Sequence, residues 1–122
     1  AARAKLRELA GVKDSEMILM GESLGGAVVV ELAADSPPRG LILQSTFSSL
    51  RDLADVHYPA LSWLVPIHKL NSSSRISRYR GPLLQSHGNR DRTVPFSSGK
   101  DLFRSANEPK QFMTIVNADH ND

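Results

Sequence analysis

The sequence contains no cysteine and no long apolar run. Without cysteine it can form neither a disulfide framework nor a thiolate metal site, so any nucleophile must be a hydroxyl, a carboxylate or an amine. The longest uninterrupted apolar stretches, residues 17–20 and 27–30, are far shorter than the roughly 20 residues that a membrane-spanning helix needs. We therefore expect no membrane span in this segment, and residues 3–8 are too charged for the apolar core of a signal peptide.

A strong excess of charge is also missing. The 15 Lys and Arg residues nearly balance the 13 Asp and Glu residues, which leaves a formal net charge of +2. The densest basic stretch, residues 69–80, has no nucleic-acid-binding motif around it. We therefore interpret this stretch as a solvated surface and expect no nucleic-acid partner.

Short apolar segments of strand length alternate along the chain with segments of helical spacing. Strands are predicted at 16–20, 40–44, 82–86 and 111–116, helices at 2–10, 23–34 and 97–106, irregular helical segments at 47–56 and 59–70, and a polar loop at 71–74. This alternation predicts an α/β fold over residues 1–122, with a parallel sheet of about four strands and helices on both faces. Residues 47–80 would form a cap-like insertion in that domain.

The most informative motif lies between the first predicted buried strand and the helix that follows it. It reads Gly21-Glu22-Ser23-Leu24-Gly25 and is extended by Gly26. The G-x-S-x-G pattern is typical of a tight turn that lifts a serine hydroxyl above a sheet, and side chains two positions either side would collide. We interpret Ser23 as a nucleophile, and Gly21, Glu22, Gly25 and Gly26 as its elbow.

The helix that is predicted to begin at this turn would supply a first hydrogen-bond donor for an oxyanion hole. The N-terminal N–H groups of a helix have no partner within the helix and lie at its positive end. The N–H group of Leu24 would therefore face the oxyanion of a tetrahedral intermediate formed on Ser23.

A serine hydroxyl reacts only when a base takes its proton and a third group orients that base. In chains with this turn the acid and the histidine follow at the ends of later strands, in the order Ser, Asp, His. Asp91 follows the third predicted strand, and His120 is the only histidine beyond the fourth. We therefore predict Ser23, Asp91 and His120 as a catalytic triad.

At three places the sequence resembles a known family. The stretch from Gly21 to Gly26, the stretch from His87 to Pro95, and Asp119-His120-Asn121 resemble the motifs of small α/β hydrolases of the bem46-like, alpha/beta-hydrolase-domain-containing type. The resemblance implies an eight-strand sheet of which this sequence matches the C-terminal half. The loop that supplies a second oxyanion donor in that family has no counterpart here, nor has the helix after the histidine. We expect the isolated chain to be less active than a complete family member for that reason.

Several residues have alternative interpretations. His87 could be a base, although its place at a strand end favours a turn residue packed under the site, and Asp119 could replace Asp91. Glu22 could face the sheet interior through a polar contact. Two further sets remain: His57 and His68, which suit surface or lid positions, and Phe47, Tyr58, Trp63 and Leu64, which could line a cap wall or pack in the core. The pair His87 and His120 with Asp91 could suggest a metal site, but the set has no third ligand at the regular spacing of metal-binding motifs, so we expect no metal.

These observations predict a serine hydrolase that cleaves a carboxylic ester, a thioester or an amide of a small acyl substrate, without a cofactor. The alternative is a binding or scaffold domain that keeps the fold without catalysis. The strand at 16–20 is apolar and has no lysine or proline, the devices that protect edge strands. If it lies at an edge, we expect it to pair with a second copy or with another chain.

Overall fold

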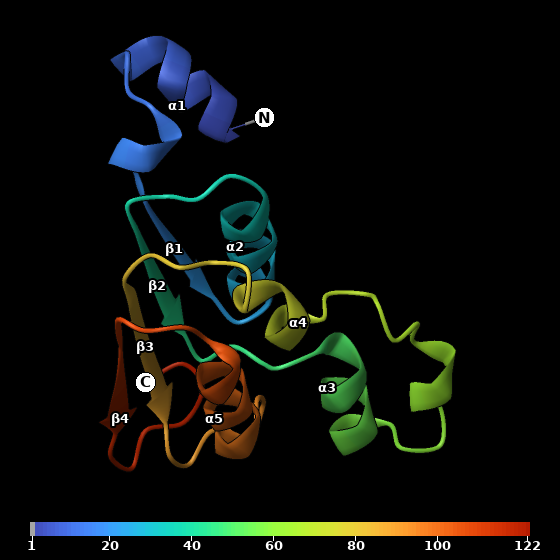
Figure 1. Cartoon of the computed structure of the whole chain (residues 1–122). Coiled ribbons are helices and arrows are strands. Elements are labelled where there is room, and N and C mark those ends of the chain that lie inside the picture. Colours follow the sequence, from blue (N-terminus) through green and yellow to red (C-terminus); the bar gives the residue numbers. More distant parts are fainter. Residues whose placement is uncertain (1) are drawn as a thin grey trace.

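The computed structural model describes residues 2–122, which are built around one parallel sheet (Figure 1). Its strands are β1 (Ile18–Glu22), β2 (Gly40–Gln44), β3 (Leu83–Gly88) and β4 (Lys110–Ile115). Their order in the sheet follows their order in the chain, and every neighbouring pair is parallel. The predicted four-strand parallel α/β fold is therefore confirmed.

The helices lie between the strands, as the alternating pattern predicts. They are α1 (Ala2–Ala10), α2 (Leu24–Asp35), α3 (Leu50–His57), α4 (Ser72–Ile76) and α5 (Phe96–Ser105), with short 3-10 turns η1 (Asp14–Glu16) and η2 (Ser62–Leu64). Gly11 ends α1 in the left-handed region, with φ of 65°. A serine side chain caps α3, where Ser49 accepts a hydrogen bond from the N–H of Asp52.

The helices that pack on the sheet lie on one face of it, not on both as expected (Figure 1). Because strand order follows chain order, every crossover steps in the same direction, and right-handed crossovers of that kind place their helices on one side. On the covered face, strand side chains pack against helix side chains in a core that includes Leu41, Leu43 and Leu83 from the strands and Val30, Ala33, Ile76 and Leu102 from the helices. The other face is open among the described residues, and Ile18 and Met20 on it are 62% and 61% exposed.

Two predicted boundaries are corrected. The strand expected at 16–20 begins at Ile18 and continues to Glu22, because Glu16 closes the η1 turn by accepting a hydrogen bond from the N–H of Lys13. The polar loop expected at 71–74 contains the start of α4, since the Asn71 side chain accepts the N–H of Ser74 as an N-cap. The later end of β1 matters for the site, because the strand then runs directly into Ser23.

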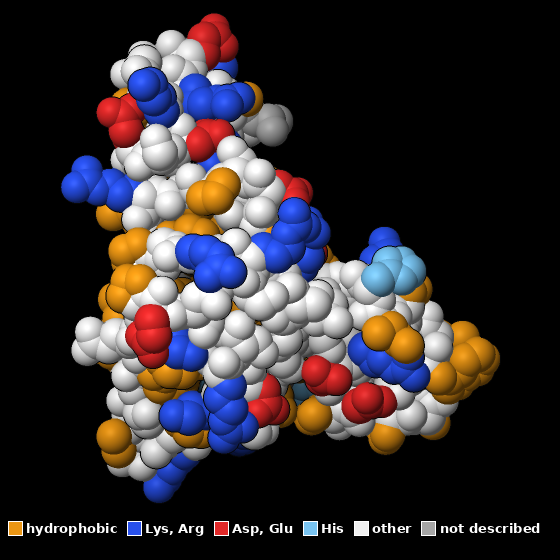
Figure 2. All heavy atoms as spheres, viewed as in Figure 1, with side chains coloured by type: hydrophobic (Ala, Val, Ile, Leu, Met, Phe, Trp, Pro, Cys, Tyr) orange, Lys and Arg blue, Asp and Glu red, His pale blue; other side chains and the backbone are white. Residues whose placement is uncertain are grey.

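The segment from residue 47 to residue 71 carries α3 and η2 away from the sheet (Figure 1). Tyr58, Trp63 and Leu64 are each more than half exposed there, and apolar side chains gather at this end of the molecule (Figure 2). Phe47 is instead buried against Ala27 and belongs to a small core cluster, so it forms no part of an exposed cap wall. The cap role of the segment stays a prediction.

No helix in residues 2–122 is both long enough and apolar enough to cross a membrane.

Candidate active site

Ser23 occupies the sharp turn between β1 and α2. Its backbone has φ of 51° and ψ of −124°, a conformation that a residue with a side chain rarely adopts. The N–H of Ser23 donates to the carbonyl of Gln44 on β2, 3.0 Å away, so pairing with the sheet continues into the turn. The strained backbone is thereby tied to the neighbouring strand, and such strain is found most often at functional sites.

The glycines around Ser23 do not all have the steric role expected of them. A Cβ on Gly21 would lie 2.5 Å from the carbonyl oxygen of Gly25, and one on Gly26 would lie 2.5 Å from the Cβ of Thr46. Gly25 has open space where a Cβ would be, so the expected collision is not found there. The expected interior contact of Glu22 is also corrected, since alternation along β1 turns this side chain to the open, exposed face.

The structure brings Ser23, Asp91 and His120 together at the carboxyl ends of three strands. The Nε2 atom of His120 is 3.1 Å from the hydroxyl oxygen of Ser23, and its Nδ1 atom is 2.8 Å from Oδ2 of Asp91. A carboxylate can only accept, so Nδ1 carries the proton and donates a hydrogen bond to Asp91. Nε2 is then left as the acceptor for the Ser23 hydroxyl.

The carboxylate of Asp91 is fully buried and accepts hydrogen bonds on both oxygens. Its Oδ1 atom accepts the backbone N–H groups of Thr93 and Val94, at 2.9 and 2.8 Å. These bonds close the loop after β3 and leave Oδ2 directed at His120. The loop therefore fixes the acid and, through it, the plane of the imidazole ring.

His87 lies beneath Asp91 and is completely buried. Its Nε2 atom is 2.9 Å from the carbonyl oxygen of Val94 and 3.4 Å from Oδ2 of Asp91. Both of these groups are acceptors, so Nε2 carries the proton. His87 is thus a donor that supports the Asp91 loop, and the structure does not bring it to Ser23.

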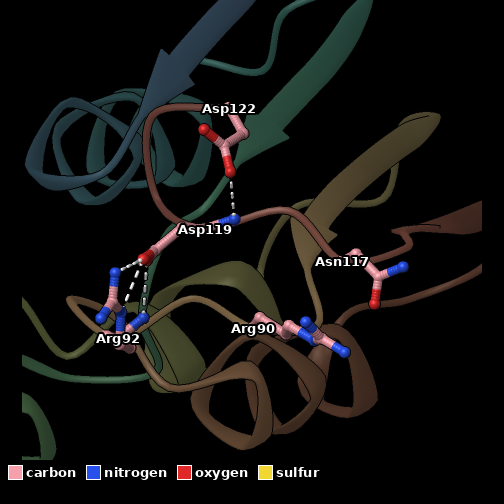
Figure 3. A pocket seen from close by; sticks show the side chains of 5 residues that line it. All are labelled: Arg90, Arg92, Asn117, Asp119 and Asp122. Carbon is pink, nitrogen blue, oxygen red and sulfur yellow. Dashed lines mark hydrogen bonds and ion pairs between the residues drawn. The ribbon is translucent and has the colours of Figure 1, made fainter.

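Asp119, the alternative acid, is held in a different contact (Figure 3). Arg92 donates to it from its backbone N–H at 3.0 Å and from Nε at 2.7 Å, and the backbone N–H of His120 donates to it at 2.8 Å. The hydrogen bond from the Arg92 backbone, followed by those from the His120 backbone and the Arg92 side chain, lowers the pKa of Asp119 to about 2. Asp119 therefore links the Asp91 loop to the His120 loop, a contact that the sequence analysis missed.

A pocket lies on the outer side of this Arg92–Asp119 link (Figure 3). It is lined by Arg90, Arg92, Asn117, Asp119 and Asp122 and does not include Ser23. In the close view the Arg92 side chain points to Asp119, whereas the Arg90 side chain lies apart from it.

The remaining candidates lie away from the reacting atoms. His57 contacts the carbonyl oxygen of Thr93 through Nε2 at 2.6 Å, and His68 lies on the surface beside Asn71. Within residues 2–122 no group of three or more His, Asp or Glu side chains is arranged to hold a metal ion.

Leu24, the expected oxyanion donor, is the first residue of α2. Its N–H belongs to the first turn, where the helix provides no partner. Leu24 as a whole is 54% exposed. The first turn of α2 therefore leaves a backbone donor on the residue that follows Ser23.

The chain is similar to known proteins over almost its whole length. It is 38% identical to the uncharacterized protein Rv2307c of Mycobacterium tuberculosis, covering 99% of this chain and 44% of that protein. It is 30% identical to human alpha/beta hydrolase domain-containing protein 17B, covering 100% of this chain and 41% of that protein. No family model matches the sequence. The chain thus spans less than half the length of these curated relatives.

Solved structures are also similar to the chain, and they identify its fold. The crystal structure of the esterase domain of a Rhodothermus marinus protein superposes with a TM-score of 0.75 at 26% identity, covering 98% of this chain and 57% of that one. Acetyl xylan esterase 1 of Thermoanaerobacterium sp. JW/SL YS485 superposes with a TM-score of 0.78 at 17% identity, covering 99% and 45%. The chain therefore has the α/β-hydrolase fold, which it shares with its human relative and with these structural neighbours.

Proposed function

We propose that the chain carries the catalytic centre of a serine hydrolase that cleaves a carboxylic ester, a thioester or an amide of a small acyl substrate. The observation that carries this proposal is the continuous hydrogen-bonded line from Ser23 through His120 to the buried Asp91. The arrangement has the order and roles of a Ser-His-Asp triad. The hydrolase fold shared with the esterase domain of the Rhodothermus marinus protein supports the same class of reaction.

The proposed reaction runs in two halves. The Ser23 hydroxyl oxygen attacks the substrate carbonyl carbon while Nε2 of His120 takes the hydroxyl proton. The bond to the leaving group then breaks, the leaving group receives that proton from His120, and the acyl group stays on Ser23 as an ester. A water molecule attacks this ester in the same way, which releases the carboxylic acid and restores the Ser23 hydroxyl.

Two groups stabilise charge in this scheme. Asp91 orients His120 and stabilises the imidazolium that forms during each attack. The N–H of Leu24, at the positive end of α2, donates to the oxyanion that develops on the former carbonyl oxygen. His120 must be neutral to accept the proton of the Ser23 hydroxyl.

The test is a comparison of ester, thioester and amide hydrolysis by the intact natural protein and by its Ser23→Ala variant. A p-nitrophenyl ester should give a burst of about one equivalent of p-nitrophenol when deacylation is slower than acylation, so that the acyl-enzyme accumulates. The alanine should remove both burst and turnover, while the matched variant Ser86→Ala, on β3, should keep them. A folded wild-type protein that hydrolyses none of these substrates would instead favour a binding or scaffold role.

A further inference from the structure

Thr46 lies just beyond the end of β2 and is completely buried. A buried hydroxyl is almost always hydrogen-bonded, because an unpaired one loses its bonds to water without compensation. The Thr46 hydroxyl donates to the carbonyl oxygen of Ser23, 2.7 Å away. Thr46 therefore contacts the backbone of the elbow, not the Ser23 side chain.

The carbonyl that Thr46 contacts belongs to the peptide unit that joins Ser23 to Leu24. This unit is planar, so the direction of its carbonyl also fixes the direction of the Leu24 N–H. A donor on the carbonyl oxygen therefore sets where the Leu24 N–H points. It also polarises the peptide unit, which strengthens the N–H as a donor.

The remainder of the Thr46 side chain packs against the same turn. A Cβ on Gly26 would come within 2.9 Å of the Thr46 Cγ2 atom, so the close approach requires glycine at this position. The N–H of Gly26 also donates to the Ser23 carbonyl, at 3.0 Å. The carbonyl thus has two donors, one from the backbone and one from Thr46.

We propose that Thr46 is a positioning residue that aims the Leu24 N–H at the developing oxyanion through the shared Ser23–Leu24 peptide unit. The inference rests on the proposed function, because it needs an oxyanion at this place. It assigns a role in the reaction to a residue that does not contact the substrate. The Leu24 N–H should matter most in the transition state, where the oxygen carries its charge.

The test uses Thr46→Val, which keeps the shape and removes the donor, and Thr46→Ser, which keeps the donor and removes the methyl group. Because Gly26 still donates to the Ser23 carbonyl, the valine leaves no buried acceptor unpaired, and the fold should persist. In the intact natural protein we expect the valine to lower kcat for ester hydrolysis about tenfold with KM unchanged, less than the loss of a whole oxyanion donor. The serine variant should stay within about threefold of wild type.

The amide signal of Leu24 gives a readout that does not depend on turnover. In Thr46→Val its proton resonance should shift and its exchange with solvent should change, whereas Thr46→Ser should resemble wild type. Thr46→Ala provides a second variant without the donor and should reproduce the valine result. Kinetics and Leu24 signals that are the same in all variants, or a serine variant as impaired as the valine, would overturn the role of Thr46. A wild-type Ser23 that does not react would overturn the proposed function itself, and this inference with it.

Discussion

Asp91 is the residue on which the proposed base depends. Its Oδ2 atom accepts a hydrogen bond from the N–H at Nδ1 of His120, and this bond leaves Nε2 free to receive the Ser23 proton. The carboxylate is buried and held by two backbone N–H groups, so it cannot turn away from the ring. The tautomer of His120 is therefore fixed by the loop that follows β3.

Replacing Asp91 with asparagine should lower kcat by about 10⁴-fold, as in triads where the amide stabilises the wrong histidine tautomer. The matched control is Asp119→Asn, which changes the neighbouring carboxylate and should cost much less, because Asp119 contacts only the backbone of His120. Steady-state ester kinetics on both variants decide between the two acids. If the control lost more activity than Asp91→Asn, Asp119 would be the acid instead.

The sequence was sufficient to predict the three residues that the structure brings together, because each lies in the turn or loop that follows a strand, and parallel strands end at one edge. Thr46 follows a strand end too, but no pattern distinguishes it from the other small polar residues after β2. Gly25 shows the opposite error: the motif suggested a steric need, and the structure has space there. Such contacts depend on how closely α2 approaches β2, which the sequence does not specify.

At the scale of elements, the site depends on two loops that the Arg92–Asp119 contact joins. Arg92 follows Asp91 in the loop after β3, and Asp119 precedes His120 in the loop after β4. The contact therefore joins the loop that carries Asp91 to the loop that carries His120.

Arg92→Ala removes the side-chain part of this contact and keeps the backbone N–H bond to Asp119, and it should loosen the His120 loop and lower kcat several-fold. Arg90→Ala is the matched control, because its side chain lies apart from Asp119 (Figure 3) and should leave kcat unchanged. Hydrogen exchange of the backbone N–H of His120 should rise in the first variant only. Equal effects of the two substitutions would show that the link does not position the base.

The link should also make stability depend on pH in a defined window. The pKa of Asp119 falls from 3.8 to about 2, so the carboxylate stabilises the folded state above pH 3.8 and this contribution is lost as pH falls toward 2. The difference in urea midpoint between wild type and Asp119→Asn should therefore be larger at pH 6 than near pH 2.5. A difference in urea midpoint that is the same at pH 6 and near pH 2.5 would contradict the lowered pKa of Asp119.

Patterns of apolar spacing predicted the strands and most helices, but they did not predict on which face the helices would lie. That property follows from strand order, and order depends on contacts between distant segments. The start of β1 and the presence of α4 were decided by side chains bonded to nearby backbone groups, at Glu16 and Asn71. These local bonds compete with the hydrophobic pattern and are hard to identify from composition alone.

At the scale of the whole molecule, β1 is an edge strand of the described sheet, because it pairs only with β2. Ile18 and Met20 lie exposed on it, and Leu24 and Val28 on the neighbouring helix α2 are about half exposed. An apolar edge without lysine or proline is open to pairing with another strand. We propose that the isolated 122-residue chain associates with a second copy through β1.

Sedimentation of the isolated chain over a range of concentrations tests this. The wild-type chain should associate, and Met20→Lys should shift it toward monomer by placing a charge beside the edge. Val116→Lys, a matched change of an exposed apolar residue after β4, should leave the association unchanged. A wild-type chain that is monomeric at every concentration would rule the association out.

Covalent labelling is the most direct test of the central claim, that Ser23 is the nucleophile of a serine hydrolase. The intact natural protein is treated with a fluorophosphonate, and the adduct is located by peptide mapping. The account predicts one adduct on Ser23, its loss in Ser23→Ala, and its retention in Ser86→Ala. An adduct on a different serine, or labelling that persists in a folded Ser23→Ala protein, would contradict it.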